Sequence, residues 1–174
     1  ETLNRPFIWN ALQAPRMNEW IDKIADENLR TQVKEALSRF ESRTLPKLKE
    51  LPNQLIHNDA NDWNIVTTES GPSLIDFGDM VHAPLILDLA NAAGDFLSPQ
   101  QDVSETILHL VRGYRSVTPL EEAEADALID LIDVRLLMTP LIGAMKLAEG
   151  HPVQGYLETF GDRCLPLLDA MIPA

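Results

Sequence analysis

The sequence predicts an α+β fold that is mostly helical and carries one small β-hairpin. Apolar residues recur at three- and four-residue spacing along most of the chain, which is typical of helices with one buried face. Short runs rich in β-branched residues are concentrated between residues 55 and 76. At 174 residues the chain has the length of one ordinary domain, so we expect residues 1–174 to form a single domain with its own core.

The segment before the strands is expected to be an extended arm followed by two helices. Residues 1–16 hold two prolines with aromatic residues between them, which favours an arm docked on the body. Asn18 is the expected cap of a short helix over residues 19–25. A long helix is expected over residues 29–51, kinked or interrupted at Pro46.

Three short strands are expected next, and two of them should form a hairpin. The turn over residues 69–72 contains Gly and Pro and joins the second strand to the third. Such a hairpin brings Asn64, before the second strand, close to Asp76, after the third. The expected strands are residues 55–56, 65–68 and 73–75.

Helices account for the rest of the predicted fold. After a connector over residues 80–84, helical spacing predicts four helices. Pro140 is expected to break or bend the third, so that residues 141–149 form a separate piece. The expected helices cover residues 84–97, 102–114, 119–149 and 153–171.

Composition narrows the classes of partner and compartment. The chain has 27 acidic and 14 basic residues and a formal charge of −13, which argues against nucleic acid or an anionic membrane as partner. Cys164 is the single cysteine and lies among leucines, so we expect a buried, unreactive thiol and a reducing, cytoplasmic compartment. No apolar run is long enough for a membrane span, and no signal peptide is expected.

Polar side chains capable of chemistry gather at the ends of the predicted strands. Asp59 and Asn64 lie five residues apart, and Asp76 returns to the same end of the hairpin. Phosphoryl transfer requires a carboxylate that accepts the hydroxyl proton of the acceptor, together with Mg²⁺ on the nucleotide phosphates. Mg²⁺ favours oxygen ligands, so one loop holds the groups that this reaction needs.

Other kinds of site fit these residues less well. In an EF-hand loop counted from Asp59, position five would be Trp63 and position six Asn64, where an oxygen ligand and Gly are required. A Gly-x-Ser-x-Gly nucleophile motif is absent, and no second Cys or paired His suggests zinc. Turn capping explains one or two of Asp59, Asn61 and Asn64, but not the whole ordered set.

This ordered set resembles the catalytic and metal loops of kinases with the protein-kinase-like fold. The matching segments are His-x-Asp-x4-Asn at residues 57–64 and Ile-Asp-Phe-Gly at residues 75–78. Asn58, the absence of Arg before Asp59, and Asp-Leu-Ala at 88–90 are more similar to the aminoglycoside phosphotransferase and choline kinase branch. Within that branch, residues 57–64 resemble hydroxylysine-kinase-like small-molecule kinases, including those fused to class III aminotransferases.

The resemblance implies a role for each residue of the set. Asp59 would be the catalytic base, and Asn64 and Asp76 would bind Mg²⁺ with ATP or GTP. His57 would be a structural member that ties the loop to the metal strand, and Asp88 would steady the loop from the following helix. The acceptor would be the hydroxyl of a small molecule, with an amino alcohol favoured.

The resemblance also implies that helices after the metal loop contribute to the acceptor pocket. Arg135, Met138, Lys146 and Tyr156 are the candidate lining residues. Trp63 either forms a wall of that pocket or packs in the interior.

Two features expected of a complete kinase of this type are not found in the sequence. The chain contains no Gly-x-Gly-x-x-Gly cover, and no β-rich segment with a strand Lys precedes residue 55. The resemblance therefore implies the C-terminal lobe of a longer kinase, without its N-terminal nucleotide lobe, inactive alone and fused to or associated with further domains. Alternatives are a non-catalytic kinase-like regulatory or binding module of a larger polypeptide, and a helical scaffold whose loop only caps strands. Aminoglycosides, choline, hydroxylysine, homoserine and sugars all stay open as acceptors.

Overall fold

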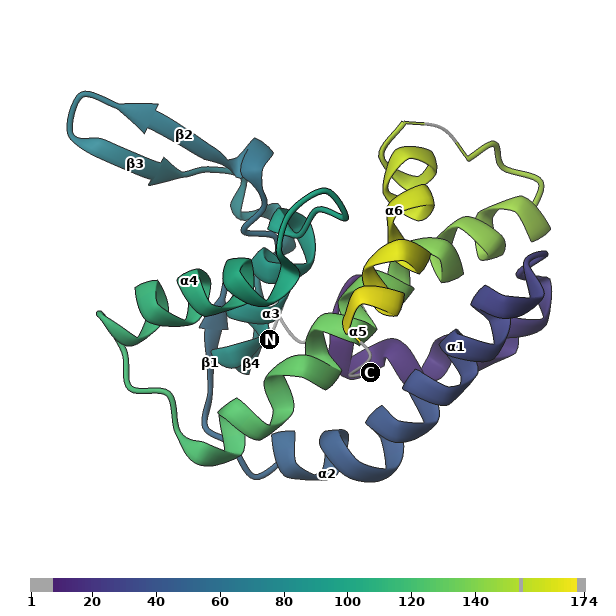
Figure 1. Cartoon of the computed structure of the whole chain (residues 1–174), viewed down its shortest axis with the longest axis horizontal. Helices are drawn as coiled ribbons and strands as arrows, with labels where there is room; N and C mark the ends of the chain where they lie inside the picture. Colours follow the sequence, from purple (N-terminus) through teal and green to yellow (C-terminus); the bar gives the residue numbers. More distant parts are fainter. Residues whose placement is uncertain (1–7, 154, 172–174) are drawn as a thin grey trace.

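Helices make up most of the structure, a computed structural model that describes residues 8–153 and 155–171. Two antiparallel sheets of two strands each accompany the helices in these residues, which confirms the predicted α+β class. The hairpin formed by β2 and β3 projects away from the helical body (Figure 1). The buried apolar side chains of the helices form one cluster that includes residues of β1 and β4.

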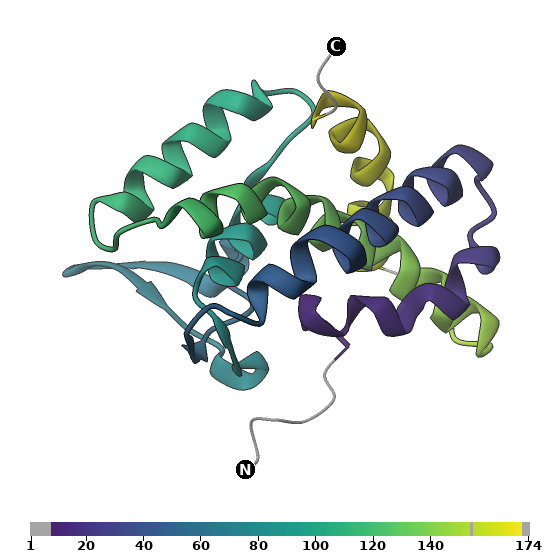
Figure 2. The ribbon, with the colours of Figure 1, turned by 90° about the horizontal axis from the view of Figure 1, so that it is seen from below.

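Helix α5 (Glu122–Ala148) is the central element of the fold. It runs through the middle of the molecule in both views (Figures 1 and 2) and packs against η1 (Ala11–Lys23), α3 (Ile86–Phe96) and α6 (Tyr156–Met171). Every residue from 131 to 144 is buried except the proline among them. A helix that is covered on all sides needs no polar face, which accounts for its mostly apolar sequence here; the charged exceptions, Asp133 and Arg135, are both ion-paired.

Pro140 does not break α5, so the predicted break is wrong. The proline ring lacks an N–H, which leaves the carbonyl of Leu136, one turn earlier, without its helical donor. The thiol of Cys164 on α6 donates to that carbonyl, with Sγ 2.9 Å from the oxygen. Cys164 is buried as predicted, and burial raises the pKa of its thiol to about 12, so the proton needed for this bond is retained.

The N-terminal segment differs from the predicted arm. Residues 1–7 lie outside the described residues, and the segment that follows forms η1, a 3₁₀ helix capped by Asn10 and not by Asn18. The side chain of Asn10 accepts a hydrogen bond from the backbone N–H of Leu12 at 3.0 Å. One face of η1 packs against α5 although the helix contains a proline, and its buried residues are Ala11, Ala14, Met17 and Ile21.

The long helix expected over residues 29–51 is divided into three pieces. The α-helix α1 (Glu27–Arg39) continues into the π-helical turn η2 (Phe40–Thr44), which leads into α2 (Leu45–Leu48). Pro46 lies in the first turn of α2, where no intrahelical N–H donor is required. The interruption was expected, but the π-helical turn was not.

Four short strands pair locally and across the loop. β2 (Ile65–Thr68) and β3 (Gly71–Leu74) form the predicted hairpin, although β3 begins two residues before the expected strand. β1 (Asn53–Ile56) pairs with β4 (Val81–Pro84), so the predicted connector over residues 80–84 is wrong. β4 alternates buried and exposed side chains at its start, as a strand with one covered face does.

The remaining helices agree with the prediction except at their ends. α4 (Val103–Arg115) matches the expected helix over residues 102–114 to within one residue. α5 begins three residues after Pro119, where residues 121 and 124 form a capping box. α3 follows β4 directly, and α6 begins later than expected.

A network of charged side chains joins α1 to α5. Arg39 forms ion pairs with Asp130, 2.8 Å from Nε to Oδ1, and with Asp133. The hydroxyl of Thr44 also donates to Asp130. Burial raises the pKa of Asp133 to about 6, because pairing with Arg39 offsets only part of the lost hydration.

We predict that the contribution of Asp133 to stability falls as the pH rises from about 4 to about 6. The folded chain keeps the Asp133 proton up to about pH 6, whereas the unfolded chain releases it near the ordinary pKa of 3.8. The unfolded state therefore binds fewer protons in this window, and the free energy of unfolding declines with pH. Relative to Asp133→Asn, the wild-type chain should lose on the order of 2 to 3 kcal/mol between pH 4 and pH 7.

Urea unfolding at both pH values measures this difference. Asp126→Asn is the matched control, because Asp126 is an exposed carboxylate of the same helix. Equal pH dependence in the wild type and in Asp133→Asn would contradict the prediction.

We also predict that Cys164 and Pro140 are coupled. Cys164→Ala should cost about 1 to 3 kcal/mol of unfolding free energy, because it leaves the buried carbonyl of Leu136 without a donor. In a Pro140→Ala background, residue 140 regains an N–H for that carbonyl, so the cost should shrink. A double-mutant cycle of unfolding free energies measures the coupling, and an equal cost in both backgrounds would show that the thiol does not replace the missing donor.

Candidate active site

The loop between β1 and β2 carries three of the predicted site residues, and α3 holds its backbone. The carboxylate of Asp88 accepts hydrogen bonds from the backbone N–H of His57 at 2.9 Å and from that of Asn58 at 2.6 Å. One turn later on α3, Asn91 donates from Nδ2 to the carbonyl of Asn58 at 2.9 Å. Burial raises the pKa of Asp88, and the two N–H donors partly oppose that rise. Asp88 and Asn91 therefore fix the path of the loop, in which Asn58 has a left-handed backbone with φ 66°.

His57 joins this loop to the segment that leads to Asp76. Its Nε2 donates to the carbonyl of Ile75 at 3.0 Å, and its Nδ1 accepts from the backbone N–H of Asp59 at 3.3 Å. A carbonyl oxygen can only accept, so these two contacts require the neutral tautomer protonated at Nε2. The ring of Phe77 meets the buried imidazole edge to face, with centroids 4.9 Å apart.

The carboxylate of Asp59 is held by two amides. Asn61 donates from Nδ2 to Oδ1 at 2.9 Å, and Asn64 donates from Nδ2 to Oδ2 at 2.8 Å. Burial raises the pKa of Asp59, whereas the nearby Arg135 guanidinium and the bond from Asn61 lower it. A carboxylate that is fixed in place, with its pKa shifted toward neutrality, is suited to accept a proton from a hydroxyl.

Asn64 and Asp76 present oxygen atoms that suit a hard cation. The Nδ2 of Asn64 is directed to Asp59, so its Oδ1 has no hydrogen-bond partner within the described part of the chain. Asp76 is exposed, has a left-handed backbone with φ 59°, and accepts a 3.3 Å bond from the backbone N–H of Gly78. The backbone N–H of Ile75 bonds to the carbonyl of Asn64 at 2.9 Å, which places the two segments side by side.

The side-chain oxygens of Asn64 and Asp76 fit a magnesium ion bound together with nucleotide phosphates. Mg²⁺ keeps several waters and takes one or two protein oxygens beside the phosphates. In residues 8–153 and 155–171, no group of three or more His, Cys, Asp or Glu side chains could hold a metal ion by itself. The side chain of Asp76 makes no hydrogen bond to Asp59 or Asn64 within these residues. The two predicted ligands are brought together by the β2–β3 hairpin, by the backbone bond of Ile75 to Asn64 and by the bond of His57 to the carbonyl of Ile75.

A cavity of about 180 Å³ adjoins the carboxylate of Asp59. The structure brings Arg135 to this cavity, but Met138 and Lys146 do not line it. Met138 is fully buried in the core and Lys146 is exposed on the surface. The side chain of Tyr156 lies outside the described residues. The cavity is lined by Trp9, Asp59, Asn61, Asp79 and Arg135.

Some residues of the site were missed or misjudged from the sequence. Asn91 lies one helical turn from Asp88, a spacing that could have indicated a shared task. The sequence indicates only a turn-capping role for Asn61. Its side chain does cap η3 (Asp62–Asn64), but it also holds Asp59. Trp63 is 81% exposed, so the alternative of interior packing is wrong.

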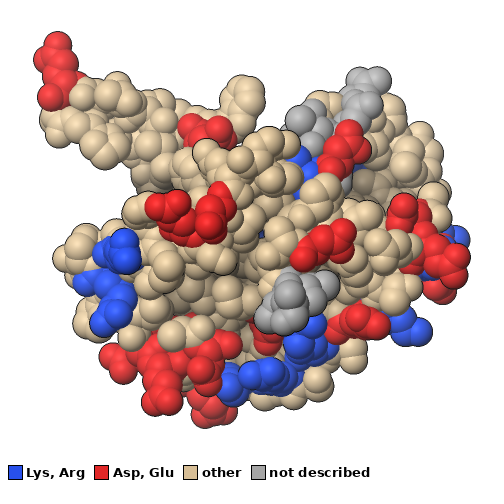
Figure 3. Space-filling view, viewed as in Figure 1, with Lys and Arg blue, Asp and Glu red and all other residues tan. Residues whose placement is uncertain are grey.

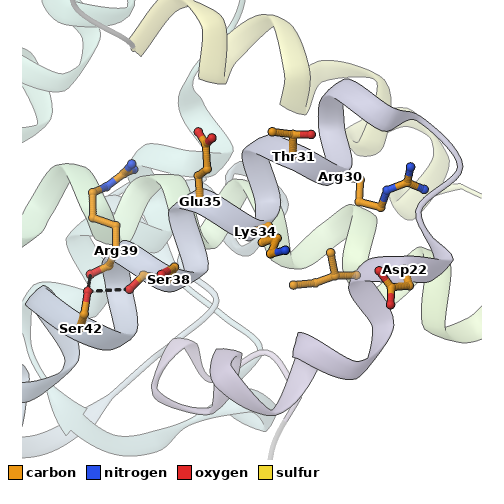
Figure 4. A pocket seen from close by; sticks show the side chains of 9 residues that line it. Asp22, Arg30, Thr31, Lys34, Glu35, Ser38, Arg39 and Ser42 are labelled. Carbon is orange, nitrogen blue, oxygen red and sulfur yellow. Dashed lines mark hydrogen bonds between the residues drawn. The ribbon is translucent and has the colours of Figure 1, made fainter.

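A larger cavity lies away from the loop, between η1 and α1. It has a volume of about 720 Å³ and is lined by polar and charged side chains of both signs (Figure 4). Asp22, Arg30, Lys34 and Glu35 are among the lining residues, and none of the loop residues is. Size alone therefore does not identify the functional site.

The charged surface agrees with the acidic composition. On the face shown in Figure 3, basic side chains form small groups separated by acidic and uncharged surface, and the tip of the hairpin is acidic. This face does not offer the extended positive surface that a nucleic acid backbone requires. In the described residues, each helix is too short or too polar to cross a lipid bilayer.

Comparisons with curated proteins find kinases. The chain is 26% identical over 157 residues to the hydroxylysine kinase of Danio rerio, covering 87% of the chain and 44% of that protein. It is 24% identical over 148 residues to the hydroxylysine kinase of Mus musculus, covering 79% of the chain and 39% of that protein. The chain thus spans less than half the length of these relatives.

Comparison with solved structures finds the same fold. An ethanolamine kinase of Plasmodium vivax superposes with a TM-score of 0.57 at 18% sequence identity, over 96% of this chain and 50% of that one. The match supports the predicted architecture, the C-terminal lobe of a protein-kinase-like fold. In sequence, residues 2–127 match the model of the APH phosphotransferase enzyme family. Because residues 2–127 make up most of the chain, the chain belongs to the phosphotransferase enzyme family.

Proposed function

We propose that this chain is the C-terminal catalytic lobe of a kinase that phosphorylates a small-molecule alcohol. The observation that carries the proposal is the Asp59 carboxylate, held by two asparagine amides beside the available oxygen of Asn64. Family membership and relatives named for hydroxylysine and ethanolamine support an acceptor that has both an amine and a hydroxyl. ATP or GTP is the proposed donor, and the cytoplasm is the proposed compartment.

In this proposal Asp59 orients the acceptor and removes its proton. The hydroxyl oxygen of the acceptor forms a bond to the γ-phosphorus, and its proton passes to the Asp59 carboxylate. The bond between the γ-phosphorus and the β,γ-bridging oxygen breaks, and the nucleoside diphosphate leaves with that electron pair. The amides of Asn61 and Asn64 keep both carboxylate oxygens in place, which limits the loss of orientation that a mobile base would suffer.

Asn64 and Asp76 would hold Mg²⁺ through their side-chain oxygens. When bound, the ion neutralises charge on the transferred phosphoryl group. The left-handed backbone of Asp76 costs of order 1 kcal/mol or more for a residue with a side chain, and such conformations cluster at functional sites. The hydrogen bond from the backbone N–H of Gly78 holds the carboxylate of Asp76 at the start of the 3₁₀ turn that follows, Phe77–Asp79.

The rest of the nucleotide site is proposed to come from outside residues 1–174. The chain spans less than half of its hydroxylysine kinase relatives, and its sequence has no Gly-rich phosphate cover. Apolar side chains are exposed on and beside the loop, as expected for a surface that a second lobe covers. They are Leu55, Trp63, Ile65, Ile75 and Phe77, which are 39% to 81% exposed.

We predict that Asp59→Asn in the full-length enzyme lowers kcat by about 10²- to 10⁴-fold, the usual contribution of a general base. Nucleotide affinity should change little, because Asp59 is not a proposed metal ligand. Asp62→Asn is the matched control, since Asp62 is an exposed carboxylate in the same loop. Steady-state phosphorylation assays and nucleotide titrations measure both effects. Near-normal turnover of Asp59→Asn would show that the base is wrongly assigned.

We predict a different result for Asp76→Ala. Loss of a metal ligand should weaken binding of the Mg²⁺–nucleotide complex at least tenfold, in line with the effect of removing groups that support a metal site. Binding of nucleotide without Mg²⁺ should stay close to wild type. Calorimetric titrations with and without the metal measure these two nucleotide affinities separately. Equal affinity of Asp76→Ala and wild type for Mg²⁺–nucleotide would exclude Asp76 as a ligand.

A further inference from the structure

The cavity beside Asp59 contains a cation to which the proposed reaction assigns no role. Arg135 extends from the middle of α5 and lines this cavity of about 180 Å³ together with Asp59 and Asp79. Its side chain is 5% exposed, and its Nη2 lies 3.0 Å from Oδ2 of Asp95 on α3. The volume corresponds to about six water molecules, which suits part of a small molecule.

The packing of three elements directs Arg135 to this place. A Cβ added at Gly94 on α3 would lie 2.8 Å from Cγ of Arg135, so the absence of a side chain there makes room for the arginine stem. The ring of Trp9 faces the guanidinium, with its centroid 5.1 Å from Cζ. A helix glycine, an aromatic ring and a buried carboxylate thus position one guanidinium at the candidate site.

Stability alone does not explain this arrangement. A buried ion pair is often no more stabilising than apolar side chains of similar volume, because both charges lose their hydration. Glycine inside a helix is also unfavourable compared with alanine. Arg163 of α6 offers a contrast: its Nη2 donates to the carbonyls of Asp95 and Leu97 at the end of α3, and it does not line the cavity.

The charges around the cavity match a particular class of acceptor. An amino alcohol presents a hydroxyl to Asp59 and an ammonium to a carboxylate, but it has no group for a guanidinium. A hydroxy amino acid presents these two groups and a carboxylate as well. The planar guanidinium of arginine binds carboxylates through paired, charge-assisted hydrogen bonds.

We propose that Arg135 binds the carboxylate of the acceptor, and that the acceptor is therefore a hydroxy amino acid. This inference rests on the proposed function and narrows its acceptor from any amino alcohol to one that also carries an acid group. Arg135 then determines specificity, while Asp59 performs the proton transfer.

The test compares acceptors that differ only by the carboxylate. Suitable pairs are 5-hydroxylysine and its decarboxylated amine, homoserine and 3-aminopropanol, and serine and ethanolamine. For the full-length wild-type enzyme, kcat/KM should be about 10- to 100-fold higher for the amino acid of the preferred pair, as expected for hydrogen bonds to a charged group. Arg135→Lys keeps a positive charge beside Asp95 and should lower that ratio at least tenfold, whereas Arg163→Lys should leave it unchanged.

The ratio of kcat/KM for the amino acid to kcat/KM for its decarboxylated partner separates the possible outcomes. If Arg135 acts only through the charge that it places near Asp59, Arg135→Lys changes kcat/KM for both members of a pair alike, and an unchanged ratio overturns the inference. A wild-type enzyme that prefers the amino alcohol also overturns the inference. This comparison needs no variant, so the inference can be tested even if Arg135→Lys fails to fold. In either case phosphorylation that depends on Asp59 would leave the proposed function intact. Phosphorylation of neither member of any pair would overturn the inference, and the proposed function would then be tested by phosphorylation of other alcohols, with Asp59→Asn as the inactive control.

Discussion

The two hydrogen bonds that Asp88 accepts from the loop backbone are the constraint on which the candidate site depends. They hold consecutive N–H groups of His57 and Asn58, just before Asp59, and Asn91 holds the next carbonyl. Bonds to a carboxylate are roughly twice as strong as bonds between neutral groups, so a half-buried Asp88 is a firm anchor. Without it, the left-handed turn at Asn58 would have fewer contacts to define its direction, and Asp59 would lose its fixed position.

Helix α5 connects this anchor to the core of the molecule. It packs along α3, which carries Asp88, and it supplies Arg135, whose partner Asp95 also lies on α3. At Pro140, the thiol of Cys164 from α6 donates to the carbonyl of α5 that lacks its helical donor. Core packing and site geometry therefore share the same helices, so the loop can be rigid although it lies at the surface and is followed by an exposed hairpin.

The parts of the structure that follow from local chemistry could be predicted from the sequence, and the parts that depend on distant partners could not. The β2–β3 hairpin is set by a short turn, and the approach of Asp59 and Asn64 needs only a five-residue loop. The pairing of β1 with β4 bridges the whole loop and hairpin, so no local pattern indicates it. The thiol that donates to the carbonyl of Leu136 comes from a residue 28 positions away, and Arg135 pairs with a carboxylate 40 positions away. Trp9 also lines the cavity although it lies 50 residues before Asp59, and the loop itself gives no sign of it.

In the proposed enzyme, the loop around Asp59 and the turn at Asp76 share one metal–nucleotide complex. Paramagnetic Mn²⁺ in place of Mg²⁺ tests this directly, because it broadens the NMR signals of nearby nuclei when bound with nucleotide to the full-length enzyme. We expect strong broadening of the amide signals of residues 59–64 and 75–79, and little effect on residues 22–42 around the larger cavity. Broadening confined to that cavity, or strong at only one of the two loop segments, would contradict the claim.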